Sequence, residues 1–302
     1  MFDIASSPNL AGETKSLEPP VGLGRAPSDR DLQRANGSGR VVLSGSGKGN
    51  QIVDLFQRSP VRIMFPRTDG GTIEEAVLIN TAGGVAGGDR YESAVTALAD
   101  AAITVTSQAA ERIYRALDEP ARIATRLKAC EGGKLAWLPQ ETIIFNWARL
   151  NRKTEIDVYS GAELLALEWL VFGRAAHGEE LLGGEIKDSW CVKRDGRLIW
   201  ADSFRVTTEI FPHLRRKALL GECKAIGTLV YFGPINGGLE FLHGVLLTLE
   251  CQCAATTVGE LTIIRFAAVA SYDLRLALRD FLRQFGEALG RGPFRVPKMW
   301  MC

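Results

Sequence analysis

The chain has 302 residues, of which 36 are lysine or arginine and 35 are aspartate or glutamate, so its formal net charge is +1. A nucleic-acid-binding protein usually carries a basic field, and the total charge gives no sign of one. Glycine is over-represented, with 32 residues or about 11% of the chain against roughly 7% in average proteins, which predicts many tight turns between short strands.

Composition also bears on location and on metal binding. No run of 18 apolar residues occurs, so we expect no membrane-spanning helix and no membrane partner. The six cysteines are scattered without Cys-x-x-Cys pairs, which indicates reduced thiols and a cytoplasmic protein. The three histidines lie far apart, which excludes a metal site built from a local histidine motif.

Residues 1–48 are rich in serine, glycine, proline and charge, and they show no sustained apolar period. Such a segment buries too little apolar surface to offset its ordering entropy. We therefore expect a disordered N-terminal extension over 1–48 and a single domain over 49–302.

From about residue 50, short apolar runs and alternating patterns predict strands, each bounded by glycine, aspartate or proline. Asp195-Gly196 lies between two apolar runs and predicts a type I′ hairpin. The turn spacing is typical of a mainly β protein. The predicted strands are 61–66, 72–82, 90–98, 101–108, 134–145, 153–160, 163–173, 189–206, 227–233, 244–254 and 261–270.

One strong helix is expected near the C-terminus, over 272–289, with Ser271 as its cap and Gly290 as its end. A second, shorter helix is expected within 209–220, and 108–117 is either helix or loop. Two faces of the C-terminal helix are defined by an apolar stripe and by a row of arginines. The stripe is Leu274, Leu278, Phe281, Leu282 and Phe285, and the row is Arg275, Arg279 and Arg283.

Four glycines fall within residues 83–88, between two predicted strands. A phosphate-binding loop is one interpretation, which would make the chain a nucleotide- or phosphate-binding enzyme. The Walker motif requires Gly-Lys-Ser/Thr, however, and the dinucleotide fingerprint requires a following helix. The alternative is a double-glycine turn in which Asp89 accepts hydrogen bonds from backbone amides.

Two carboxylates stand in apolar surroundings. Glu141 follows Pro139 inside an apolar run, and it either handles an ion or a partner, or lies solvated in a turn between two strands. Glu168 has apolar neighbours on both sides, and a solvent-facing strand position is the commoner place for such a glutamate; the alternative is an inward carboxylate that lines a cavity. Cys251 and Cys253 are interpreted as structural thiols, since too few further soft ligands lie nearby for a stable metal site.

Several motifs at matching spacing resemble the UreD (UreH) family of urease accessory proteins, over about residues 52–302. They share the family's order along the chain, while residues 1–48 have no counterpart. The matching blocks are RIMFP at 62–66, GGVAGGD at 83–89, TSQAAERIYR at 106–115, WLPQETIIF at 137–145, GRAAHGE at 173–179 and VPKMW at 296–300.

The resemblance implies a mainly β, elongated body of stacked strands with about two helices. It also implies a scaffold or chaperone rather than an enzyme, one that joins UreF and the GTPase UreG on apo-urease. In such a protein no cofactor is tightly bound, and nickel passes in transit through an internal polar channel.

By motif and chemistry, we assign candidate residues to three roles: nickel transit, a structural loop and partner contact. The transit candidates are Asp89, Glu141 and Glu168 with the hydroxyls of Thr106 and Ser107; the loop is Gly83, Gly84, Gly87 and Gly88; the contact candidates are Tyr114, Arg115, Arg275, Arg279 and Arg283. A stable metal-storage protein remains an alternative.

Overall fold

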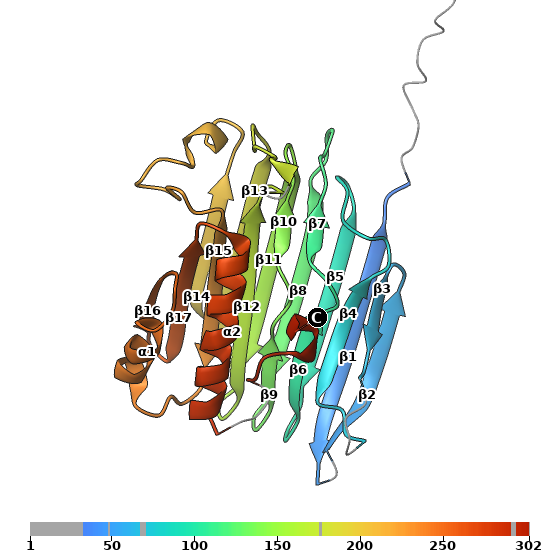
Figure 1. The fold of residues 1–302 in the computed structure, drawn as a ribbon. Coiled ribbons are helices and arrows are strands. Elements are labelled where there is room, and N and C mark those ends of the chain that lie inside the picture. Colours follow the sequence, from blue (N-terminus) through green and yellow to red (C-terminus); the bar gives the residue numbers. More distant parts are fainter. Residues whose placement is uncertain (1–32, 48, 67–70, 175–176, 291–293, 302) are drawn as a thin grey trace, which may run out of the picture. The chain divides into compact units, whose positions relative to one another are not determined.

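The computed structural model describes residues 33–47, 49–66, 71–174, 177–290 and 294–301, and the chain forms a compact unit that begins at Arg34. The disorder expected for residues 1–32 lies outside the described residues. Two β-sheets form most of this unit (Figure 1).

Seven strands make up the first sheet. In spatial order they are β14 (Arg197–Val206), β13 (Glu185–Arg194), β11 (Arg149–Val158), β8 (Ala121–Ala129), β5 (Arg90–Ala97), β1 (Asn36–Ser46) and β2 (Gly49–Arg58).

Ten strands make up the second sheet, eight of them in one continuous order. These are β16 (Gln252–Val258), β17 (Leu261–Ala268), β15 (Ala225–Phe232), β12 (Glu163–Phe172), β9 (Lys134–Trp137), β6 (Ala102–Ser107), β4 (Glu75–Asn80) and β3 (Val61–Met64), while β10 (Thr142–Ile144) pairs with β12 and with β7 (Glu111–Ile113).

The chain alternates between the two sheets from β5 to β13. Strands β5, β8, β11 and β13 lie parallel in the first sheet, and β6, β9 and β12 lie parallel in the second. Each coil of the chain therefore adds one strand to the first sheet and one long strand to the second, with β7 and β10 as short additions, and successive coils stack as in a solenoid. The expected mainly β, stacked-strand fold is confirmed.

Antiparallel pairs close the two ends of this arrangement. One of them is the β13–β14 hairpin, in which Asp195 and Gly196 have φ values of 49° and 77°. Two consecutive positive φ values are what a type I′ turn requires, so the predicted hairpin is confirmed.

Two predictions are wrong, one about the end of the disordered extension and one about the structure of residues 108–117. Residues 36–46, assigned to the disordered extension, form β1, whose Val41 and Leu43 are fully buried between the sheets. Residues 108–117 contain strand β7 instead of a helix, because the backbone of 111–113 pairs in parallel with β10.

Two further predictions fail in the C-terminal third. The strand expected at 244–254 is replaced by helix α1 (Gly238–Leu246) and the start of β16, since Leu242, Val245 and Leu246 share one buried helical face. The helix expected at 209–220 is reduced to a 3-10 turn at Phe211–His213.

Helix α2 (Ser271–Ala288) confirms the expected C-terminal helix and lies against the outer face of the second sheet near β15 and β17 (Figure 1). All five residues of its predicted apolar stripe are buried. Gly290 follows it with a φ of 74°, but Ala270 is the N-cap, so the predicted capping role of Ser271 is wrong. Among the described residues, no helix combines the length and apolar character that crossing a membrane requires.

Candidate functional site

A row of polar side chains crosses the space between the two sheets and separates two apolar clusters. On the first sheet the row follows the strand register, with Ser93 opposite Thr125, Thr125 opposite Thr154, and Arg152 opposite Asp188. The second sheet adds two residues from the facing side. We call this row the polar belt; it consists of Ser93, Thr125, Thr142, Arg152, Thr154, Glu168 and Asp188.

A cavity of about 310 Å³ adjoins the polar belt. Its lining includes Glu111, Glu168 and Arg152, and also the exposed residues Gln108 and Arg112, so the cavity reaches the protein surface at the β6–β7 connection. Ionisable groups therefore extend from the surface to the centre of the space between the sheets.

Arg152 lies at the centre of the polar belt and is buried. Its Nε and Nη2 atoms donate hydrogen bonds to the two carboxylate oxygens of Asp188 at 2.9 and 2.6 Å, and its Nη1 donates to Thr142 at 3.0 Å. Burial alone would lower the pKa of Arg152, but the charges of Asp188 and Glu168 outweigh burial and raise this pKa above its ordinary value. The Arg152 guanidinium therefore keeps its proton and its positive charge.

Glu168 points inward from β12, so the solvent-facing interpretation is wrong and the cavity-lining one holds. Its Oε1 accepts hydrogen bonds from Trp137 Nε1 at 3.1 Å and from the Thr154 hydroxyl at 3.0 Å. Its Oε2 lies 3.0 Å from Arg152 Nε, yet this oxygen accepts no hydrogen bond from the described residues, since the single Nε hydrogen is directed to Asp188. Burial raises the pKa of Glu168.

Glu111 on β7 lies nearer the surface end of the same cavity. Its Oε1 accepts a hydrogen bond from Asn80 Nδ2 at 3.1 Å. Burial raises the pKa of Glu111 to about 7, although the hydrogen bond from Asn80 and the charge of Arg112 act in the opposite direction. Near neutral pH this carboxyl group is therefore partly protonated.

Asp89 is not brought together with the other transit candidates. Its two carboxylate oxygens accept hydrogen bonds from the backbone amides of Ala35 and Ala86, both at 2.8 Å, and it does not line the cavity. Thr106 also lies apart, with its hydroxyl donating to Leu138 O at 2.7 Å. Ser107 does line the cavity, and it accepts a hydrogen bond from the Gln140 amide at 2.9 Å.

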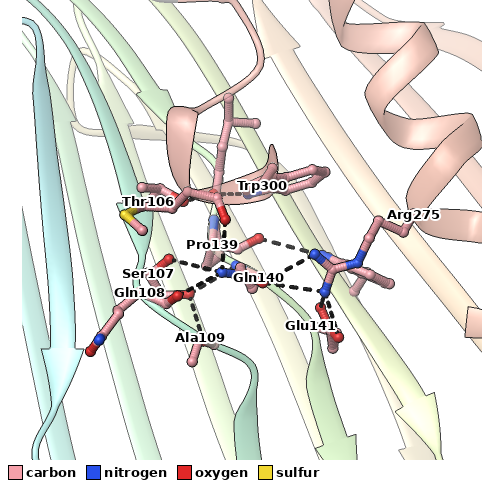
Figure 2. A network of polar contacts seen from close by, with 12 residues as sticks. Thr106, Ser107, Gln108, Ala109, Pro139, Gln140, Glu141, Arg275 and Trp300 are labelled. Atoms are coloured by element: carbon pink, nitrogen blue, oxygen red, sulfur yellow. Dashed lines mark hydrogen bonds and ion pairs between the residues drawn. The ribbon is translucent and has the colours of Figure 1, made fainter. Parts of the chain in front are cut away.

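Glu141 is neither solvated nor in the cavity, because it is paired with Arg275 of α2 (Figure 2). The same guanidinium donates to Gln140 Oε1 from two nitrogens, each at 3.2 Å. Trp300 Nε1 donates to Leu138 O at 3.1 Å. The Pro-Gln-Glu corner between β9 and β10 is thus a junction at which α2 and the C-terminal segment attach to the second sheet.

The glycine-rich loop at 83–88 is held by close backbone packing. A Cβ on Gly84 would lie 2.5 Å from the Tyr114 ring, and one on Gly87 would lie 2.6 Å from Ala116 Cβ, while Gly83 and Gly88 have positive φ. Strand β5 follows the loop, where a phosphate-binding loop would precede a helix. The loop and Asp89 therefore have the double-glycine turn geometry.

The partner-contact candidates fall into two groups. Arg115, Arg279 and Arg283 are exposed. Tyr114 instead packs into the glycine loop, where its hydroxyl donates to Gly83 O at 3.1 Å, and Arg275 is engaged by Glu141. Tyr114 and Arg275 therefore already form contacts within the chain.

Cys251 and Cys253 lie next to each other, and burial raises the pKa of both thiols, that of Cys251 to about 12. Within the part of the chain that the structure describes, no group of three or more histidine, cysteine, aspartate or glutamate residues is arranged to hold a metal ion.

Among the carboxylates and the buried arginine of the site, sequence reasoning missed Glu111, Arg152 and Asp188, and it also missed the hydroxyl residues of the polar belt. The strand that contains Arg152 alternates strictly, with Leu150, Arg152, Thr154, Ile156 and Val158 on its buried side. An arginine on the apolar side of an alternating strand is the signal that points to a buried charge network.

Comparison with known proteins agrees with the sequence motifs. A family model described as UreD urease accessory protein matches residues 35–301. Urease accessory protein UreD 1 of Brucella abortus is 37% identical over 275 residues, covering 90% of this chain and 96% of that protein. Urease accessory protein UreD of Methylobacterium sp. is 36% identical over 277 residues, with coverages of 89% and 96%. The chain belongs to the UreD family of urease accessory proteins.

Proposed function

We propose that this chain is a urease maturation factor that assembles with UreF and the GTPase UreG on apo-urease and passes nickel toward the urease active site. The observation that carries the proposal is the cavity beside the polar belt, which connects the surface to buried carboxylates in a chain of the UreD family.

The chemistry of this cavity suits a cation that must keep moving. Nickel is a borderline cation that accepts oxygen ligands, and binding must be weak enough for release. Glu111 near the surface and Glu168 at the inner end supply separated carboxylates, with the hydroxyls of Ser107, Thr125 and Thr142 along the cavity. This spacing favours transit over storage.

Two of the carboxylates expected to carry nickel are engaged in other contacts. Asp89 is occupied by two backbone amides, and Glu141 by Arg275, so neither carboxylate faces the cavity. Glu111 and Glu168 are the two carboxylates that line it. We therefore assign nickel transit to these two.

The test is urease activation in cells that express urease, UreF, UreG and this chain. We expect Glu168→Gln and Glu111→Gln each to lower urease activity per purified complex by about tenfold, the lower range for substitutions around metal sites. Glu119→Gln, which changes an exposed glutamate paired with Arg122, is the matched control and should leave activity unchanged. Unchanged activity in both cavity variants would refute the transit assignment.

Partner contact is tested separately. Arginine side chains frequently anchor protein interfaces, so we expect Arg115→Ala to reduce co-purification of UreF. Arg40→Ala, at an exposed position on β1, is the control. Undiminished recovery of UreF with the Arg115 variant would remove this residue from the interface.

A further inference from the structure

A second, smaller cavity of about 40 Å³ lies on the other side of the polar belt. Glu168 lines both cavities, whereas Arg152 lines only the first and Asp188 only the second. The ion cluster of Arg152, Glu168 and Asp188 is therefore the partition between them. The smaller cavity has room for roughly three water molecules.

The smaller cavity leads toward the surface on its far side. Thr228 and Arg265 line it, and both also line a surface depression beside β16 and β17. Arg265 donates to Thr228 at 2.8 Å and pairs with Asp202 at 2.5 Å, and both members of this ion pair are partly exposed. The two cavities and the depression thus form a series, with Arg152 between the first two and Arg265 between the smaller cavity and the depression.

We infer that Arg152 is the gate of this passage: its guanidinium occupies the position between Glu168 and Asp188 through which a divalent cation passes from the larger cavity to the smaller one. This inference rests on the proposed transit function and adds to it a second chamber and a closing element. A passing dication replaces the guanidinium as the partner of the two carboxylates, and the guanidinium withdraws into the larger cavity, where Thr142 already accepts one of its hydrogen bonds.

Three arguments favour a gate over a purely structural ion pair. Buried ion pairs are often no more stabilising than apolar side chains of the same volume, so stability alone does not account for the cluster. Glu168 Oε2 is buried and accepts no hydrogen bond from the residues described, although it lies at the partition. The charge of the cluster also permits exchange: two carboxylates and one guanidinium sum to −1, and a dication in place of the guanidinium brings the sum to zero.

A double-mutant cycle tests the gate, with urease activity measured per purified complex at limiting Ni²⁺. Asp188→Asn removes one carboxylate and leaves Arg152 facing Glu168 alone, so we expect the gate to stay closed and activity to fall about tenfold. The double variant Arg152→Gln with Asp188→Asn keeps the cluster charge at −1 but lacks the guanidinium. We expect it to recover activity to at least the level of the unmodified chain.

A structural role predicts the opposite result, since loss of both partners would leave the double variant as impaired as the single one or more so. Failure to recover activity in a folded double variant would therefore overturn the gate. Arg40→Gln with Asp54→Asn makes the same paired change at an exposed ion pair on β1 and β2 and should have no effect.

Arg152→Lys provides a second measurement if the double variant does not fold. Lysine keeps the positive charge but lacks the fork that reaches both carboxylates, so we expect activity at limiting Ni²⁺ to equal or exceed that of the unmodified chain. Lower activity per complex would count against the gate. Glu168→Gln and Glu111→Gln separate the two proposals: if both leave activity unchanged, transit itself fails, whereas reduced activity in these variants without rescue in the cycle refutes only the gate.

Discussion

Arg275 on α2 binds both carboxylate oxygens of Glu141, with Nη2 at 2.7 Å from Oε1 and 2.5 Å from Oε2 (Figure 2). The two side chains are only 25% and 13% exposed. This ion pair ties a helix on the outside of the second sheet to the corner that carries Gln140, a residue of the cavity lining.

The ion pair between Arg275 and Glu141 should contribute to stability. Arg275→Gln leaves a largely buried carboxylate without its cation, and we expect the free energy of unfolding in urea to fall by about 1–3 kcal/mol. Arg279→Gln, at an exposed position on the same helix, should change it by less than about 0.5 kcal/mol. Equal effects of the two substitutions would contradict this assignment.

The glycine loop should tolerate no side chain at residue 84. Gly84→Ala places a Cβ against the Tyr114 ring, and we expect a loss of about 1–3 kcal/mol in the free energy of unfolding. Tyr114→Ala in the same chain should relieve part of that loss, which a double-mutant cycle would measure as a positive coupling. Gly244→Ala, inside α1 with open space around it, is the control and should be neutral or stabilising; additive losses at Gly84 and Tyr114 would refute the contact.

Glu111 should make stability depend on pH. Its pKa is about 7 in the folded chain against an ordinary value of 4.5, so the folded state holds the proton more tightly. This contribution is fully present below pH 4.5 and is lost as the pH rises through 7. We expect Glu111→Gln to stabilise the chain by roughly 1–3 kcal/mol at pH 8 and by little at pH 5; a pH-independent difference in urea denaturation would contradict the burial of this carboxyl group.

Cys251 should react slowly with thiol reagents. Burial and the neighbouring Cys253 raise the pKa of Cys251 to about 12, so little thiolate is present near neutral pH. We expect iodoacetamide at pH 8 to modify Cys251 much more slowly in the folded chain than in the urea-denatured chain, as followed by peptide mass spectrometry. Equal rates would show that the thiol is accessible and ordinary.

The strands and helices that the sequence predicts well are those with local signals. Helix α2 has a sustained apolar stripe, and the β13–β14 hairpin has Asp195-Gly196 at its turn. Helix α1 is harder, because its buried face depends on packing beside β16 and α2 and its apolar residues also suit a strand. Strand β1 is hard to predict because its glycines are typical of a flexible tail. In the structure Gly39 instead lets the backbone pack closely against Val61.

The site is less predictable than the fold, because its members come from separate strands. Glu168 and Asp188 are identified as one cluster only when β11 and β13 are paired in register and β12 of the facing sheet is placed over Arg152. Asp89 and Glu141 lie in the strongest motifs, but the motif does not reveal that backbone amides or Arg275 occupy them. A strong motif in this chain can therefore belong to a structural contact within the fold, as at Asp89 and Glu141.

The alternation of the chain between the two sheets has a consequence for the length of the polar belt. At this level of the stack each coil supplies one inward-facing hydroxyl to the first sheet, as Ser93, Thr125 and Thr154 illustrate on β5, β8 and β11. Neighbouring strands lie about 4.8 Å apart, so each coil adds about that length to the stack. Adding one coil would lengthen the proposed passage by one such step and leave the chemistry of every existing step unchanged.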